Sequence, residues 1–160
     1  MASTASISER AVSLASSPPQ ARRTLLFRVG STVYGCDIDD IREIVPFRAA
    51  TRLPGAPRYV QGLINLRGTI ITVLDLGVRL HPVRTPVSDG SILLVALTGS
   101  TRFVGIAVQE VMDVRVVGAQ HEDVVMPAAD HDAVRGLAHV DGATVILLDT
   151  HTLVRQVLLS

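Results

Sequence analysis

The sequence VQGLINLRGTIITVLDL, at residues 60–76, is the stretch that decides the fold of this chain. It is almost uniformly apolar, its second half is rich in β-branched residues, and a single polar group, NLRG at residues 65–68, interrupts it. Two short apolar runs separated by a glycine-containing turn predict a β-hairpin with buried strands. The arginine at the expected tip, Arg67, is the unusual residue, because it is either solvated or bound to a specific partner.

The composition around this hairpin is that of one aliphatic globular domain. Hydrophobic residues make up 48% of the 160 positions, aromatic residues make up 3%, and tryptophan is absent, so that the core must consist of Val, Ile, Leu and Ala. The single cysteine, Cys36, can form no internal disulfide, which favours a reducing cytoplasm. No apolar run is long enough for a transmembrane helix, and direct insertion into a membrane is therefore not expected.

The charge distribution bears on the kind of partner. The net charge is zero and aromatic residues are scarce, so that the chain lacks the electrostatic footprint of a nucleic-acid-binding protein. Residues 22–84 hold ten arginines against five acidic residues, whereas residues 85–160 hold four against nine. This asymmetry reflects either internal neutralisation between the halves or faces of opposite charge that favour oriented association.

Local patterns predict the order of elements. Residues 1–21 are rich in Ser and Ala without an apolar period, and we expect a disordered tail before a domain at residues 22–160. The expected elements are strands at 25–29 and 32–38, a polar helix-like turn at 39–44, a strand at 45–52, the hairpin at 60–76, one helical turn at 75–80 and a final helix at 151–159.

The second half of the chain repeats the first. Residues 91–97 parallel 25–29, residues 104–114 parallel 34–44, and residues 134–142 parallel 60–68. Short strands used twice predict two small β-barrels, with one subdomain at approximately 33–90, the other at approximately 91–150, and the termini completing the barrels.

The repeat also bears on the tip of the hairpin. Glu43 falls on Asp113, and the second copy carries Asp141-Gly142 where the first carries Arg67-Gly68. Because Asp-Gly is a standard tight-turn pair, the turn does not require arginine. We therefore expect Arg67 to be present for an interaction.

Together these motifs resemble a known family. The pattern Tyr34-Gly35 with Asp37-Ile38, then residues 41–44 (IREI), a proline-containing loop, residues 62–68 (GLINLRG) and Asp75-Leu76, is similar to the CheW family of chemotaxis coupling proteins. The resemblance covers about residues 22–159. It implies a mainly β fold of two SH3-like five-stranded barrels around a shared apolar interior, with short helices and a C-terminal helix.

The resemblance also implies a function. It indicates a cytoplasmic, non-enzymatic adaptor that links the tips of methyl-accepting chemoreceptors to the regulatory domain of the histidine kinase CheA, with pseudo-symmetric assembly into rings. The length leaves no room for a kinase, phosphoacceptor or receiver domain. Two alternatives stay open: the same adaptor role in a pilus-motility or other non-flagellar pathway, and a small-ligand sensor that uses the cleft between the barrels.

The residues implied for partner binding or for organising the groove follow from the same resemblance. They are Ile41, Glu43, Ile44, Gly62, Asn65, Leu66, Arg67 and Gly68. In the family the arginine of the NLRG motif lies close to the glutamate that precedes it, and an arginine fork matches a carboxylate bidentately. The pair either orders the groove or contacts the partner directly.

One segment departs from the family pattern. The loop from Arg48 to Pro57 is unusually rich in arginine, with Arg48, Arg52 and, just beyond it, Arg58. This departure leaves open which receptor or kinase sequence the chain accepts.

Motifs for catalysis, metal binding or cofactor binding are absent from the sequence. It has no glycine-rich phosphate loop, nucleophile elbow or Cys-x-x-Cys pair. The five histidines, at 81, 121, 131, 139 and 151, fall at no ligand-like spacing. Asp75 and Asp149 each follow a strand at equivalent places in the two copies, which predicts helix capping and not a catalytic pair.

Overall fold

The structure is a computed structural model that describes residues 22–80, 86–97, 101–118 and 133–159. The expected N-terminal tail lies outside the described residues, as do His81, His121 and His131.

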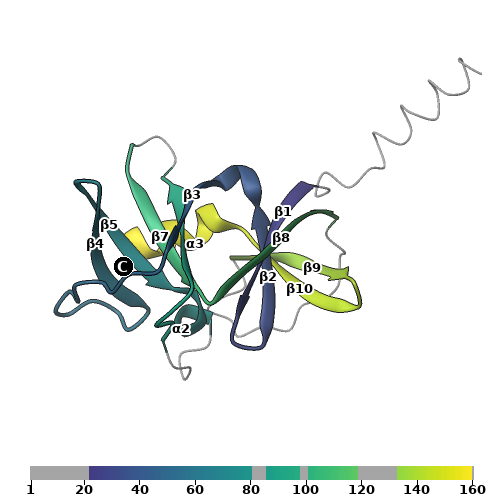
Figure 1. The fold of residues 1–160 in the computed structure, drawn as a ribbon, viewed down its shortest axis with the longest axis horizontal. Helices are drawn as coiled ribbons and strands as arrows, with labels where there is room; N and C mark the ends of the chain where they lie inside the picture. Colours follow the sequence, from purple (N-terminus) through teal and green to yellow (C-terminus); the bar gives the residue numbers. More distant parts are fainter. Residues whose placement is uncertain (1–21, 81–85, 98–100, 119–132, 160) are drawn as a thin grey trace, which may run out of the picture.

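Strands dominate the described residues (Figure 1). The elements are β1 (Arg22–Val29), β2 (Thr32–Asp37), the 3₁₀ turn η1 (Ile38–Asp40), β3 (Ile41–Pro46), β4 (Val60–Leu66), β5 (Thr69–Asp75), α2 (Leu76–Leu80), β6 (Ser91–Ala96), β7 (Phe103–Val108), β8 (Glu110–Val117), β9 (Val134–Val140), β10 (Ala143–Leu148) and α3 (Thr150–Leu159). The predicted hairpin over residues 60–76 is confirmed as β4 and β5.

The strands form two five-stranded sheets. Sheet A has the order β8-β1-β2-β10-β9, and sheet B has the order β3-β6-β7-β5-β4. The expectation of a mainly β chain with two five-stranded units is confirmed. Each sheet keeps two edge strands, since no hydrogen-bonded pairing joins its edges within the described residues.

The two sequence repeats interleave in these sheets. Sheet B combines the β6–β7 hairpin of the second repeat with β3, β4 and β5 of the first, and sheet A combines the β1–β2 hairpin of the first with β8, β9 and β10 of the second. The repeat matches β1 with β6, β2 with β7, β3 with β8, β4 with β9 and β5 with β10. With strands matched in this way, the two sheets have the same strand order. Each repeat thus places its first hairpin in the other repeat's sheet.

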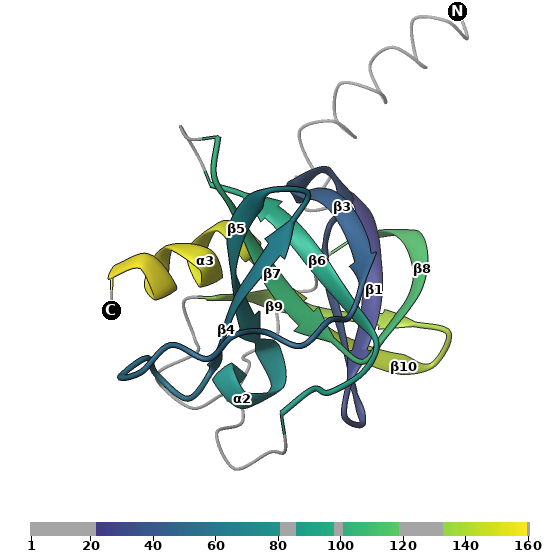
Figure 2. The ribbon, with the colours of Figure 1, turned by 60° about the vertical axis from the view of Figure 1, so that its left-hand side comes forward.

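Apolar side chains from both sheets meet in a shared core. The main cluster joins Leu25, Phe27 and Tyr34 of sheet A to residues of β4 to β7 in sheet B. Helix α3 adds Leu153 and Val154 to this cluster, and Figure 2 shows it alongside the strands of sheet B. A smaller cluster, which includes Leu26, Val145 and Leu147, consists of residues from the strands of sheet A alone.

The start of sheet B departs from the sequence-based expectation. Residues 41–46 form strand β3 against β6, so the predicted helix-like turn at 39–44 and the strand at 45–52 are wrong; the helical part is confined to η1. The register shifts between Ile41 and Glu43, which leaves Arg42 as an extra residue in a β-bulge. The bulge breaks the alternation of the strand and spaces Ile41 and Ile44 three apart, a spacing typical of a helix.

An aspartate directly precedes each of the two helices, as predicted. The side chain of Asp75 accepts a hydrogen bond from the backbone N–H of Val78 at 2.9 Å, and that of Asp149 accepts one from the N–H of Thr152 at 3.2 Å. These are N-cap bonds, which satisfy donors that lack an intrahelical partner. The two aspartates thus start helices α2 and α3.

Gly62 should not tolerate a side chain. Its φ is +138°, and a Cβ atom there would lie 2.1 Å from the backbone oxygen of Thr51, which pairs with Leu63 across the outer edge of β4. We expect Gly62→Ala to lower the free energy of unfolding by at least about 2 kcal/mol, since strain and a backbone clash combine. Urea denaturation followed by circular dichroism would measure the change.

The matched control for this substitution is Gly55→Ala. Gly55 also has a positive φ, of +80°, but its Cβ would meet no atom within 4 Å. Its substitution should cost less, because only the backbone strain remains. Equal losses in the two variants would contradict the role assigned to the close approach of Thr51.

Candidate protein-interaction site

The tip of the β4–β5 hairpin is a tight turn with two left-handed residues. Arg67 has φ of 50° and Gly68 has φ of 87°, the signs that a type I′ turn requires. The side chain of Asn65 accepts a hydrogen bond from the N–H of Gly68 at 2.8 Å, which closes the turn. Left-handed φ is unfavourable for arginine, so local backbone preference does not explain why Arg67 is there.

Arg67 forms a bidentate ion pair with Glu43 of strand β3. Its two terminal nitrogens donate to the two carboxylate oxygens of Glu43, at 3.1 and 2.5 Å. The hydrogen bond from Arg67 holds the pKa of the Glu43 carboxyl below its usual range. The side chains are 67% and 38% exposed, so solvent screens the pair and it adds little to folding stability. The pair is therefore available at the surface to a partner.

A recess adjoins this ion pair, and we call it the Arg67 recess. Its volume is about 180 Å³. Its lining residues are Arg42, Glu43, Leu66, Arg67, Thr69, Ile71, Leu94 and Phe103. The recess is thus lined by apolar side chains together with both members of the charged pair.

The other residues expected at the site have different places. Gly62 is buried and serves the approach of Thr51, and Ile41 packs partly against the core. Ile44 is 41% exposed on β3, while Asn65 and Gly68 shape the turn. The structure therefore brings Glu43, Leu66 and Arg67 together in the recess, but not all eight residues.

Sequence reasoning missed a second charged cluster, at the equivalent place on sheet A. Asp141 has φ of 52° at the tip of the β9–β10 hairpin, and both of its oxygens accept hydrogen bonds from Arg115 of β8, at 2.7 and 3.4 Å. Arg115 also contacts Asp113 at 3.0 Å, and this hydrogen bond lowers the pKa of Asp113. The repeat had aligned Asp113 with Glu43 and Asp141 with Arg67. That alignment was the available signal, although Arg115 itself has no charged counterpart in the first copy.

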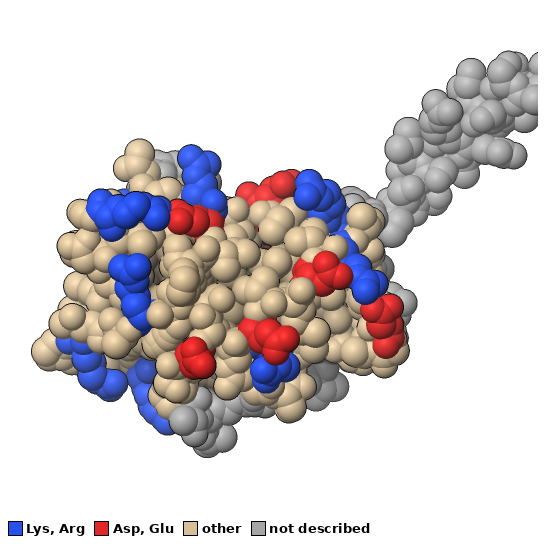
Figure 3. All heavy atoms as spheres, in the orientation of Figure 1, with Lys and Arg blue, Asp and Glu red and all other residues tan. Residues whose placement is uncertain are grey.

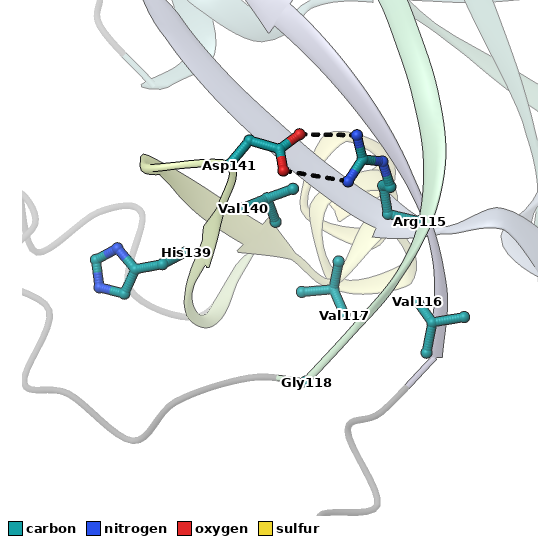
Figure 4. Close-up of a pocket in the computed structure, with 7 residues that line it drawn as sticks. All are labelled: Arg115, Val116, Val117, Gly118, His139, Val140 and Asp141. Carbon is teal, nitrogen blue, oxygen red and sulfur yellow. Dashed lines mark hydrogen bonds and ion pairs between the residues drawn. The ribbon is translucent and has the colours of Figure 1, made fainter.

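Two cavities flank this second ion pair. One, of about 400 Å³, we call the Asp141 recess; its lining residues are Leu26, Val33, Glu110, Met112, Asp113, Arg115, Val140, Asp141, Ala143 and Val145. Eight of these ten align through the repeat with the eight residues of the Arg67 recess. The other cavity, of about 300 Å³, lies on the β8–β9 side, where Arg115 and Asp141 point toward one another (Figure 4). The two sheets thus carry equivalent recesses in which the charge at the hairpin tip is reversed.

The described histidines and acidic residues form ordinary surface and capping contacts. His139 is exposed, and His151 lies 3.0 Å from the carboxylate of Asp40. Within the described residues no group of three His, Cys, Asp or Glu side chains could hold a metal ion. None of the helices in these residues has the length and hydropathy needed to cross a bilayer.

Removing Arg67 should raise the pKa of Glu43. Because the folded-state pKa is lowered from its ordinary value near 4.5, the pair contributes stability above that value and loses it as the pH falls through the folded pKa. In Arg67→Gln we expect the Glu43 carboxyl to titrate near its ordinary value, as measured by carbon-13 NMR. Arg115→Gln is the control: it should raise the pKa of Asp113 and leave Glu43 unchanged. An unchanged Glu43 titration in Arg67→Gln would contradict the pairing.

Comparison with known proteins identifies the family. The CheW-like domain model matches residues 23–158. The chain is 31% identical over 134 residues to the chemotaxis protein CheW of Rhizobium meliloti (strain 1021), which covers 80% of this chain and 84% of that protein. It is 30% identical over 135 residues to the chemotaxis protein CheW of Treponema pallidum (strain Nichols), which covers 79% and 78%.

A solved structure agrees with this assignment. The crystal structure of the scaffolding protein TtCheW from Thermoanaerobacter tengcongensis matches with a TM-score of 0.69 at 29% identity, over 83% of this chain and 92% of that one. Members of the family are scaffold or adaptor proteins and not enzymes. The match over nearly the whole domain, together with the two interleaved five-stranded sheets, shows that this chain belongs to the CheW family of chemotaxis scaffold proteins.

Proposed function

We propose that this chain is a cytoplasmic adaptor that couples methyl-accepting chemoreceptors to the regulatory domain of the histidine kinase CheA. It reaches the membrane through these partners, as part of a chemosensory array. The observation that carries the proposal is the exposed, bidentate Arg67–Glu43 pair beside an apolar recess. Folding gains little from such a pair, whereas a binding surface gains orientation from it.

Apolar side chains around the charged pairs support a binding role. Ile44 is 41% exposed on β3, and Met112, Val114 and Val116 are 48%, 38% and 76% exposed on the edge strand β8. Large apolar side chains on edge strands are a liability unless a partner covers them. Apolar contact would supply affinity, and the ion pairs would fix the direction of approach.

The two equivalent recesses support a role that links two partners at once. The Arg67 recess lies on sheet B and the Asp141 recess on sheet A, and the two recesses share no lining residue. Their tip residues carry opposite charges, which would favour a different partner surface at each sheet. This arrangement is what assembly into a pseudo-symmetric ring would require.

Affinity purification of the full chain from its native cells tests the proposal. We expect recovery of a histidine kinase and of methyl-accepting receptors, and the identity of the co-purified regulators would distinguish a flagellar pathway from a pilus-motility or other one. Recovery of neither protein would overturn the proposal. A strong rise in melting temperature with a metabolite would then favour the ligand-sensor alternative, since a ligand of the native state stabilises it by mass action.

A further inference from the structure

One edge of sheet B is lined by arginines. Between Glu43 and Asp75 the sequence holds four arginines and no acidic residue. The four are Arg48, Arg52, Arg58 and Arg67, and all are exposed; we call this set the arginine edge. Basic side chains gather at the end of the molecule that carries β4 and β5 (Figures 1 and 3).

Backbone contacts fix the arginine edge along strand β4. Near the hairpin tip, Arg48 donates a hydrogen bond to the backbone oxygen of Asn65 at 3.0 Å. Further along, Thr51 and Leu63 exchange two backbone hydrogen bonds of 2.8 Å, which place Arg52 beside Gly62. A turn closed by a bond from the N–H of Val60 to the oxygen of Pro57 places Arg58 at the start of β4.

The arginine edge therefore has an elongated shape. It follows the seven residues of β4 from the tip to the start, a length of roughly 20 Å. Glu43, at the tip, neutralises Arg67, whereas Arg48 and Arg52 form no ion pair within the described residues. An excess of positive charge thus runs along one strand and ends at the Arg67 recess.

We infer that the arginine edge binds an extended acidic segment of a partner protein. Arginine forks match carboxylates bidentately, and several spaced arginines suit a segment with several spaced acidic residues. At the tip, the Arg67 recess has room for one aliphatic side chain of the same segment. The inference deepens the proposed function, on which it rests for the view that the segment belongs to a partner of the adaptor.

The surface fits an acidic peptide better than an anionic membrane. Binding to a membrane surface combines basic residues with several apolar side chains that enter the lipid. In the described part of sheet B, only Ile44 and Ile70 are exposed large apolar residues. The apolar residues Leu66, Ile71 and Leu94 of the Arg67 recess are buried. A recess next to a row of cations favours a side chain carried on a peptide.

The test is binding of a labelled synthetic peptide to the full chain, measured by fluorescence anisotropy. The probe is a short extended peptide of glutamate and aspartate with one central leucine, and its reference is the same peptide with glutamine and asparagine instead. We expect the acidic peptide to bind, the neutral one not to bind, and the affinity to fall as salt is added. The double variant R48E/R52E should weaken binding about tenfold or more.

A matched control carries the same change in net charge elsewhere. Arg23 on β1 and Arg155 on α3 are exposed, and R23E/R155E should bind the acidic peptide as the wild type does. If both double variants bound the acidic peptide equally weakly, net charge alone would explain the effect, and the inference would be overturned. Binding to vesicles of phosphatidylcholine and phosphatidylserine, without binding of the acidic peptide, would overturn it in favour of a membrane.

The outcome separates this inference from the proposed function. If the wild type co-purifies with kinase and receptor but does not bind the acidic peptide, the inference alone fails. If it binds the peptide through Arg48 and Arg52 but co-purifies with neither protein, the adaptor proposal fails and the acidic-segment site stands.

Discussion

Co-sedimentation of the chain with receptor-containing membranes and the histidine kinase should be lost when Arg67 is replaced by glutamate. The substitution removes the bidentate bond to Glu43 and places two carboxylates together at the tip of the hairpin. A partner surface that attracts the arginine would be repelled by the glutamate. Incorporation should therefore fall about tenfold or more. The far-ultraviolet circular dichroism and the Tm should stay close to those of the wild type, because the Arg67 side chain is 67% exposed.

Two further variants define what Arg67 does. Arg155→Glu, an equal charge reversal on the exposed face of α3, is the control and should be incorporated normally. The swapped pair E43R/R67E restores the ion pair with its direction reversed. If the pair only orders the recess, the swap should restore incorporation; if Arg67 contacts the partner, it should not. Normal incorporation of the folded Arg67→Glu variant would contradict both roles.

Replacing Asp75 by alanine should cause a large loss in the free energy of unfolding. Its carboxylate is fully buried and accepts hydrogen bonds from the N–H groups of Val78 and Val87 and from the side chain of Gln61. Alanine would remove a helix cap and leave the other buried donors unsatisfied. We expect the free energy of unfolding to fall by about 3–5 kcal/mol, as measured by urea denaturation.

Asp149→Ala is the natural comparison for Asp75→Ala. Asp149 occupies the equivalent place in the second copy and caps α3 through Thr152, but it is only partly buried. Loss of that cap alone should cost about 1 kcal/mol. If the two alanine variants lost equal stability, the importance assigned to the buried network around Asp75 would be wrong.

Local sequence signals predicted much of this fold because they report short-range structure. The hairpin at residues 60–76, the capping aspartates and the duplication follow from the alternation of apolar residues, from turn chemistry and from self-similarity. Strand β3 was not predicted, because the bulge at Arg42 shifts its pattern from the period of a strand toward that of a helix. Pairing between the two repeats was also missed, since no local pattern records which hairpin joins which sheet.

The candidate site, like the fold, could be predicted in part from the sequence. The pairing of Arg67 with Glu43 was expected from the family resemblance, and the structure adds its exposure and its recess. The ion pair between Arg115 and Asp141 joins two strands that are distant in sequence, and no sequence motif predicts it. The closing of the segment at Thr51 onto β4, which positions the arginine edge, likewise depends on tertiary structure.

The exchange of hairpins between the repeats constrains how the chain folds as it is synthesised. Sheet B is built from residues 41–108 without interruption and can form once that stretch has been made. Of the ten described strands, β1 and β2 are translated first, but their neighbours in sheet A, β8 and β10, are the eighth and the last. Pairings across such sequence separations form slowly and leave strand edges open to aggregation in the meantime. Sheet A is thus completed only after the end of the domain has been synthesised, although it contains the first hairpin of the domain.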